Sequence, residues 1–169
     1  IMSSILKVDQ LQDSGGNNLV TSNGSGVITS SAFGKVLQVL NSTGTAGFDT
    51  NSTSYVQVTG TGHGVSITPS STSSKIFISI MVEARSSNSE NNSTNTILRD
   101  STDLSGGTRF ASVYGSVLDA PINMTFLDSP NTTSQVTYRI GTKSSSSSHN
   151  SRINASNRLF SYIAMEIGS

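Results

Sequence analysis

The side chains with the widest chemical range in this sequence are two histidines, because an imidazole can bind a metal ion or transfer a proton near neutral pH. His63 lies between two glycines, and His149 lies in a serine tract. Neither has a carboxylate or a second histidine at the spacing of a metal-binding motif. We therefore interpret both as loop histidines and predict no metal site and no cofactor. One alternative stays open for His63: in a trimer, its three copies could meet on the symmetry axis and bind one ion.

The acidic residues and the serines provide no catalytic group. Asp100 and Asp103 lie in RDSTDLSGG, where they could bind calcium together with backbone carbonyls, but the segment lacks the acid density of a dedicated calcium loop. Ordinary Asx turns explain the pair better. No serine lies in a G-x-S-x-G motif, and the glycines of TSNGSGV and TGTGHG lack the lysine of a phosphate-binding loop. We predict that the chain is not an enzyme and has no catalytic residue.

The composition excludes several classes of function. The 169 residues have a formal net charge of +0 and no basic cluster, so we expect no nucleic-acid partner. No apolar run approaches the roughly 18 to 20 residues that span a bilayer, so we expect no membrane insertion. The absence of cysteine excludes disulfides and zinc-thiolate sites. Only 33% of the residues are hydrophobic, and such a chain is marginally stable alone. The composition therefore favours an oligomer.

The elements that must position any site are β-strands. KIFISIMVEA, at 75–84, alternates aliphatic residues with a second row that contains Phe77 and Met81. RLFSYIAMEI, at 158–167, likewise places Phe160 and Tyr162 opposite a row of aliphatic residues. A strand that is apolar on both faces belongs in the middle of a sandwich or at a subunit interface. We therefore predict that these four side chains contribute to an oligomer interface or to central packing.

Short strands separated by polar turn clusters recur along the chain. Clusters such as NSTGTAG, PSSTSS and DSPNTT separate the apolar runs, a spacing typical of sandwiches and barrels. We predict an all-β, antiparallel, jelly-roll-like sandwich over residues 34–169. Strands are expected at 36–40, 54–59, 64–68, 75–84, 95–99, 108–118, 121–127, 135–141 and 158–167.

Residues 1–33 differ from the rest of the chain. Their short β-like runs are separated by Gly-Gly and Asn-Gly, and Asn23-Gly24 between LVTS and SGVIT predicts a hairpin. The apolar residues of this stretch are too sparse to bury one another. We therefore expect 1–33 to be an anchoring and assembly segment that depends on partner chains.

Three stretches resemble a known family. SILKVDQLQDSGGNN, GKVLQVLNSTGT and TSYVQVTGTGHGVSITPSSTSSKIFISI, together with SYIAMEI near the end, are similar to virion structural proteins of marine tailed bacteriophages. The resemblance implies a homotrimeric tail fibre or appendage with a jelly-roll-like C-terminal domain. Such a protein would be made in the bacterial cytoplasm and reside in the virion, joined to other virion proteins through its N-terminal segment. A capsid decoration protein is the alternative, and the resemblance carries no information about a ligand.

Host contact is expected on the polar loops, because loops held by a rigid scaffold often carry recognition. The candidate loops are 86–95 and 144–151, with hydroxyls and amides that can bind a host surface glycan and flanking cations that can meet acidic sugars. Simple solvated loops are the alternative. Tyr55, Tyr114 and Tyr138 could stack on sugar rings, although half-buried framework positions explain them better. The predicted receptor-contact residues are Ser87, Asn88, Asn91, Asn92, Lys143, Ser146, His149 and Arg152.

Overall fold

The computed structural model describes residues 10–22, 24–25, 28–29, 35–115 and 119–168. The chain divides into two compact units, Ile1–Lys35 and Val36–Ser169. The described residues form strands and turns, and none of them belongs to a helix of the length and apolarity that crossing a membrane requires.

The first unit is a small antiparallel sheet of β1 (Gln10–Gln12), β2 (Asn18–Ser22) and β3 (Ile28–Thr29). Asp13 closes the β1–β2 turn, because its Oδ1 accepts hydrogen bonds from the amides of Gly15 (2.8 Å) and Asn17 (2.9 Å). The predicted β2–β3 hairpin is present, although Asn23 itself lies outside the described residues. No residue of this unit whose exposure is described is buried, so the described part of the sheet has no core of its own.

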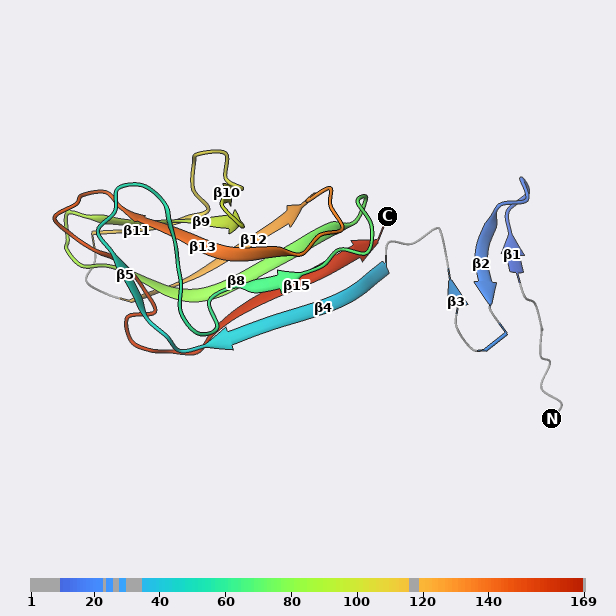
Figure 1. Ribbon diagram of the computed structural model, residues 1–169, viewed down its shortest axis with the longest axis horizontal. Helices are drawn as coiled ribbons and strands as arrows, with labels where there is room; N and C mark the ends of the chain where they lie inside the picture. The colour runs from blue at the N-terminus through green and yellow to red at the C-terminus, as the bar shows by residue number, and fades with distance from the viewer. Residues whose placement is uncertain (1–9, 23, 26–27, 30–34, 116–118, 169) are drawn as a thin grey trace. The chain divides into compact units, whose positions relative to one another are not determined.

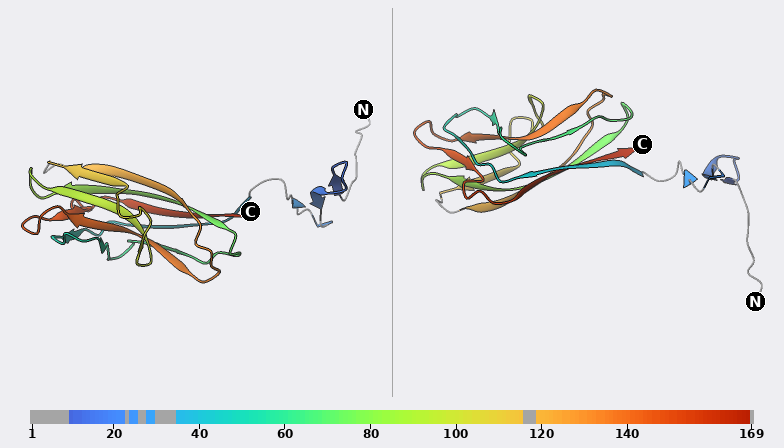
Figure 2. Two further views of the ribbon diagram at one scale, coloured as in Figure 1. Left: turned by 90° about the horizontal axis from the view of Figure 1, so that it is seen from above. Right: turned by 60° about the horizontal axis from the view of Figure 1, so that its bottom comes forward.

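The second unit contains two antiparallel sheets that lie face to face (Figure 1, Figure 2). Sheet 1 has the order β4–β15–β8–β12, and two short strands, β14 and β5, extend it beside the end of β8. The strands of sheet 1 are β4 (Lys35–Gly44), β5 (Phe48–Thr50), β8 (Lys75–Ser86), β12 (Ala120–Asp128), β14 (Ser151–Ile153) and β15 (Phe160–Gly168).

Sheet 2 has the order β7–β13–β9–β11, with β6 also paired to β13 and β10 also paired to β9. Its strands are β6 (Val56–Gln57), β7 (Val65–Ile67), β9 (Asn92–Arg99), β10 (Thr102–Asp103), β11 (Ala111–Tyr114) and β13 (Val136–Ser144).

The order of the strands confirms the predicted fold class. The two orders contain eight strands, which in chain order are β4, β7, β8, β9, β11, β12, β13 and β15. Successive strands of this series change sheet, except β9 and β11, which both lie in sheet 2. Numbered along this series, the strands lie in the spatial order 1–8–3–6 in sheet 1 and 2–7–4–5 in sheet 2. This arrangement is that of a jelly roll. The sequence analysis missed β5, β10 and β14, which are two or three residues long and have no apolar alternation. The strand expected at 108–118 is shorter, and 116–118 lie outside the described residues.

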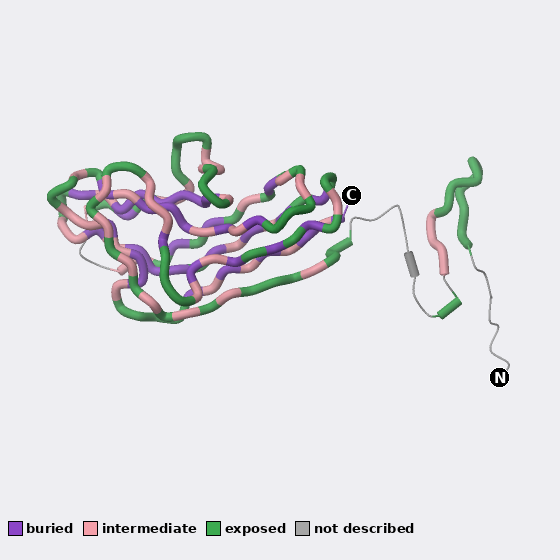
Figure 3. The backbone as a smooth tube through the Cα atoms, viewed as in Figure 1, coloured by how far each residue is buried: buried purple, intermediate pink, exposed green. Residues whose placement is uncertain are grey.

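The core lies between the two sheets and follows the period of two along each strand (Figure 3). The predicted inward row of β8 is buried, as is the alternating row of β13. The largest apolar members of the core are Ile67, Ile76, Ile78, Ile80, Ile97, Met124, Tyr138, Ile140, Ile153, Phe160 and Tyr162.

The two ends of the sandwich differ in what they carry. The chain enters at β4 and leaves at β15 at one end (Figure 1). There Lys75, the first residue of β8, pairs with Ile167. At the other end, Ser86 pairs with Ser151, and the β8–β9 and β13–β14 loops follow. The predicted contact loops therefore lie at the end of the sandwich opposite to the point of entry.

Candidate functional site

The two loops predicted from sequence lie side by side. The Ser87 amide donates to the Asn150 carbonyl (3.0 Å), and the Asn150 amide donates to the Ser87 hydroxyl (2.7 Å). The Ser145 hydroxyl accepts from the Asn92 amide at 2.9 Å. We call residues 87–91 and 145–150 the loop cluster. Among its predicted contact residues, Ser87, Asn88, Ser146 and His149 are half-buried.

Asn91 is an internal support of the loop cluster. Its side chain is 0% exposed, and its Oδ1 accepts hydrogen bonds from the hydroxyls of Ser144 (2.9 Å) and Ser145 (2.7 Å). Its Nδ2 donates to the Asn150 carbonyl at 3.4 Å. The prediction of Asn91 as a receptor contact is therefore wrong, because its amide faces inward and joins the two loops.

A layer of hydroxyl and amide groups fills the interior beneath the loop cluster. The Ser151 hydroxyl is hydrogen-bonded to those of Ser93 and Thr142, both at 2.6 Å, and Thr142 also donates to Asn95 Oδ1 at 2.8 Å. All four residues are completely buried. The sandwich interior thus changes from apolar to polar toward this end, which explains why the sequence here resembles a loop.

Replacing Asn91 with alanine is expected to lower the free energy of unfolding by about 1–3 kcal/mol, because the hydrogen bonds of a buried side-chain amide that joins the two loops are lost. Urea unfolding measures the change. Asn92→Ala is the matched control: Asn92 is half-buried, and its side-chain oxygen has no hydrogen-bond partner among the described residues. Equal effects of the two substitutions would contradict the assignment of Asn91 as an internal support.

The outer face of sheet 2 next to the loop cluster gathers polar and aromatic groups. Tyr114 of β11 pairs with Asn92 of β9, and Thr94 pairs with Lys143 of β13. The Lys143 ammonium lies 4.5 Å from the centroid of the Tyr55 ring. The predicted residues Asn92 and Lys143 therefore share one face with two of the three tyrosines singled out from sequence. Tyr138, the third, is completely buried.

The loop after β10 covers part of this face and is held by Asp103. The Asp103 Oδ1 accepts from the Thr96 hydroxyl (2.5 Å) and from the Ser105 amide (2.9 Å), and Oδ2 accepts from the Gly107 amide (3.2 Å). Burial alone would raise the pKa of Asp103, but these hydrogen bonds outweigh it and lower the pKa below its usual value. The predicted Asx turn is confirmed for Asp103. Asp100 instead accepts from the Thr137 amide at 3.0 Å.

A pocket lies between this loop and the sheet. It has a volume of about 520 Å³, and it is lined by Thr94, Gly107, Thr108, Arg109 and Lys143. Sequence reasoning named Lys143 and included Thr94 in a candidate loop, but it missed Gly107, Thr108 and Arg109, because the pairing of strands, and not spacing along the chain, brings these residues beside Lys143.

The outer face of sheet 1 carries large apolar side chains beside small polar ones. Leu127, Phe77 and Met165 lie in one row across three paired strands. Ile163 follows on β15, and Met81, 52% exposed, follows on β8. On the outward row of β8, no charged residue occurs between Lys75 and Glu83. The predicted interface residues Phe77 and Met81 thus lie on an accessible apolar face, and their contact with another chain stays a prediction.

Phe160 and Tyr162 were predicted at an oligomer interface or in central packing, and the structure contradicts the interface for both and shows central packing. Both are completely buried inside the chain's own core. The Phe160 ring stacks on His63 with centroids 4.1 Å apart, and the Tyr162 hydroxyl lies 3.0 Å from His63 Nδ1. His63 Nε2 lies 2.8 Å from the Ala46 carbonyl oxygen. Both ring nitrogens of His63 are therefore engaged within the chain, which contradicts an ion site on a symmetry axis.

The environment of His63 keeps its ring neutral. Burial lowers the pKa of His63, and the positive charge of Arg139 lowers it further, against the opposing effect of the Ala46 carbonyl. His63 therefore acts as a packed hydrogen-bonding member of the core.

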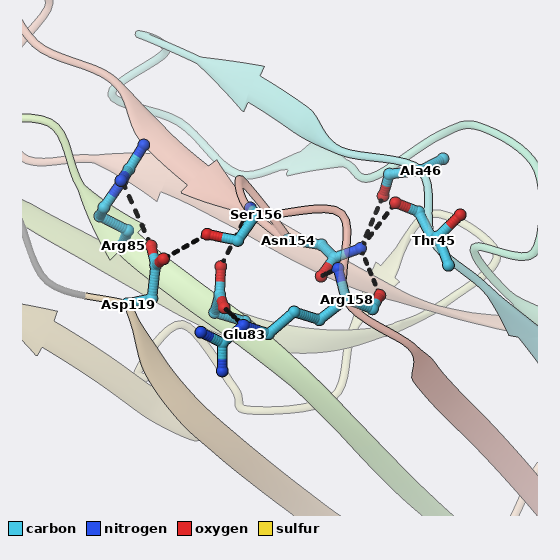
Figure 4. Close-up of polar contacts among 8 residues, drawn as sticks. All are labelled: Thr45, Ala46, Glu83, Arg85, Asp119, Asn154, Ser156 and Arg158. Atoms are coloured by element: carbon cyan, nitrogen blue, oxygen red, sulfur yellow. Dashed lines mark hydrogen bonds and ion pairs between the residues drawn. The ribbon is translucent and has the colours of Figure 1, made fainter.

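The turn between β14 and β15 is fastened to sheet 1 by polar contacts (Figure 4). Asn154 Nδ2 donates to the Thr45 and Arg158 carbonyls, both at 2.8 Å. Glu83 accepts from the Ser156 amide (3.2 Å) and pairs with Arg158 (3.1 Å). These contacts hold the turn across the outer face of β8.

Asp119 completes this cluster and pairs with Arg85 at 3.4 Å, while the Ser156 hydroxyl donates to its other oxygen (Figure 4). Glu83 and Asp119 both line a hollow of about 150 Å³. Each of these carboxylates is engaged by an arginine and by Ser156, so the pair positions the turn. Arg152, predicted as a receptor contact, lies on sheet 1, where it pairs with Asp49 at 3.2 Å.

No protein-family profile and no curated protein sequence matches this chain. The solved structures that match this chain include chains from particles of infectious bursal disease virus. A chain of the viral particle is 10% identical over 86% of this chain and 40% of its own length, with a TM-score of 0.42. A mutant VP2 protein in derived particles is 10% identical over 97% of this chain and 44% of its own length, with a TM-score of 0.43. The present chain thus spans less than half the length of these viral chains.

Proposed function

We propose that this chain is a virion building block, a homotrimeric fibre or appendage protein that assembles through the outer face of sheet 1. That face carries the proposal. An antiparallel sheet that faces water normally presents polar residues, whereas here Leu127, Phe77 and Met165 form one apolar row across three paired strands. Met81 and Ile163 lie on the same face, where the uncharged polar members of the outward rows are Ser79, Asn123, Thr125 and Ser161. Contiguous apolar surface of this kind marks interaction sites. Each large side chain stabilises by about 1.5–3 kcal/mol when it becomes fully buried.

A second copy of the chain is the partner that this surface fits. Interface centres are poor in charge and rich in aromatic residues and methionine, and their rims are polar. The centre of this face contains Phe77, Met81 and Met165, whereas the charged residues of β8 lie toward its ends, at Lys75, Glu83 and Arg85. Burial against identical copies also compensates for the low apolar content of the chain.

The first unit supports the virion assignment. None of its residues whose exposure is described is buried in the small sheet. A docking surface on another virion protein would therefore supply the buried contacts that this sheet lacks. Its sequence also carries the resemblance to tailed-phage virion proteins. We propose that residues 1–33 attach the protein to the particle and that the loop end of the sandwich contacts the host surface.

The mass of the intact chain in dilute solution tests the assembly proposal. Light scattering should give three times the mass of one chain, and Met81→Lys should give a folded monomer, because a buried ammonium without a partner opposes association. Thr102→Lys, at an exposed position of β10 in sheet 2, is the matched control and should stay trimeric. A well-folded monomer of the unaltered protein would reject the proposal.

A further inference from the structure

We infer that the outer face of sheet 2 beside the loop cluster is a binding site for an anionic saccharide, a sugar that bears carboxylate or sulfate groups. The pocket lined by Thr94, Thr108, Arg109 and Lys143 is its charged end. Four other arginines form ion pairs, but Arg109 and Lys143 form none among the described residues. The nearby acid, Asp103, is instead occupied by hydrogen bonds within its own loop. The lining of the pocket therefore holds two cations, Arg109 and Lys143, and no acidic side chain.

Contacts within the chain hold the cationic end of the site in place without a ligand. Lys143 lies over the Tyr55 ring, and the Tyr55 hydroxyl donates to the Thr108 carbonyl at 2.7 Å. The ring thereby joins the loop that carries Arg109 to the strand that carries Lys143. A site whose groups are already fixed loses less conformational entropy on binding. Charge-assisted hydrogen bonds from arginine and lysine to a carboxylate or sulfate are among the stronger polar contacts.

The rest of the face suits a sugar chain. Ser112 pairs with Thr94, and Tyr114, 72% exposed, pairs with Asn92. Lys143 and Tyr114 are separated by two strand spacings across the sheet and by about two residues along it. The distance between them is therefore on the order of 10–12 Å, which a short oligosaccharide can span. Hydroxyl and amide groups can bond sugar hydroxyls, and an exposed aromatic ring offers an apolar face with a polar tip.

The same features weigh against nucleic acid. Nucleic-acid affinity depends on many phosphate contacts from lysine and arginine, and this pocket supplies two cations. The site lies on sheet 2, the face opposite to the one proposed for assembly, so an oligomer formed through sheet 1 would leave it open. This inference rests on the proposed host contact and names the class of ligand for it. Binding of the saccharide requires only the folded chain and not the proposed oligomer.

Calorimetric titration of the intact protein tests the inference with five probes: oligogalacturonate, a sulfated dextran oligosaccharide, neutral dextran, sodium sulfate and polyglutamate. We expect binding to one or both charged saccharides and none to neutral dextran. Arg109→Gln and Lys143→Gln should each weaken that binding by about tenfold or more, and Tyr114→Ser should weaken it as well. The two charged saccharides distinguish a carboxylate from a sulfate ligand.

Lys75→Gln is the matched control, because it removes the same charge from an exposed residue of sheet 1 and should leave affinity unchanged. Three results would overturn the inference: no saccharide binding, binding that survives loss of both Arg109 and Lys143, or equal binding of polyglutamate or free sulfate. Affinity lost equally in Lys75→Gln would also overturn it by indicating unspecific attraction. Each outcome is independent of the oligomer mass, so failure here and failure of the assembly proposal are distinguishable.

Discussion

Replacing Phe160 with alanine should lower the free energy of unfolding by about 3–5 kcal/mol, the range found for removing a large aromatic side chain from a core. Phe160 is completely buried, stacks on His63, and contacts Tyr162 edge to face at 5.8 Å between centroids. Its ring also occupies the space beside Gly44, where a Cβ atom would lie 2.8 Å from it. The substitution therefore leaves a cavity between tightly packed elements.

The neighbouring Leu159 supplies the control. It is 69% exposed, and Leu159→Ala should change stability by no more than about 0.5 kcal/mol. Urea unfolding at constant protein concentration compares the two. If Leu159→Ala proved the more damaging, β15 would present its other face to the core, and the assignment of inner and outer faces in sheet 1 would be reversed.

Acid should destabilise the sandwich through Glu166. Burial alone would raise the pKa of this completely buried side chain, but hydrogen bonds from the Ser70 hydroxyl, the Gln38 side-chain amide and the Ser70 backbone amide lower it to about 2. The Ser70 hydroxyl and Gln38 Nε2 both lie 2.6 Å from its oxygens. The folded chain therefore favours the ionised carboxylate and fastens the β7–β8 loop to β15.

The sign of the effect follows from the lowered pKa. Relative to its ordinary value of 4.5, a folded-state pKa of about 2 contributes stability that is complete above about pH 4.5 and lost as pH falls toward 2. The shift corresponds to about 3 kcal/mol at neutral pH. In Glu166→Gln, unfolding measured between about pH 5 and pH 2 should depend less on pH. Glu90→Gln, at an exposed position, should keep the native dependence. An unaltered acid profile in Glu166→Gln would contradict this role.

Sequence alone predicted those strands in which one row is apolar and the other is not. In β13, Val136, Tyr138 and Ile140 alternate with polar residues, and all three are buried as expected. In β15 both rows are apolar, so the period of two cannot decide which row faces inward. The choice depends on His63 and on the space beside Gly44, and both come from segments more distant in sequence.

The candidate site was predicted only in part, because contacts between segments distant in sequence also assemble it. Asn92 and Lys143 were identified by composition, but Thr94 and Arg109 join them only through the pairing of β9, β11 and β13. Asn91 shows the opposite case. A polar residue in a polar tract resembles a solvated loop, and only the second loop folded against it makes it buried.

The position of β15 has a consequence for how the protein is made. This strand is the last of the sandwich to leave the ribosome, yet it lies between β4 and β8 and supplies Phe160 and Tyr162 to the core. Until it emerges, β4 has no neighbour in sheet 1 and the apolar rows stay open to water. Pairing between segments so distant in sequence is slow, and unfinished β-chains are prone to aggregate. Closure of the sandwich therefore follows translation of β15, and a chain interrupted before this strand would leave β4 unpaired in sheet 1.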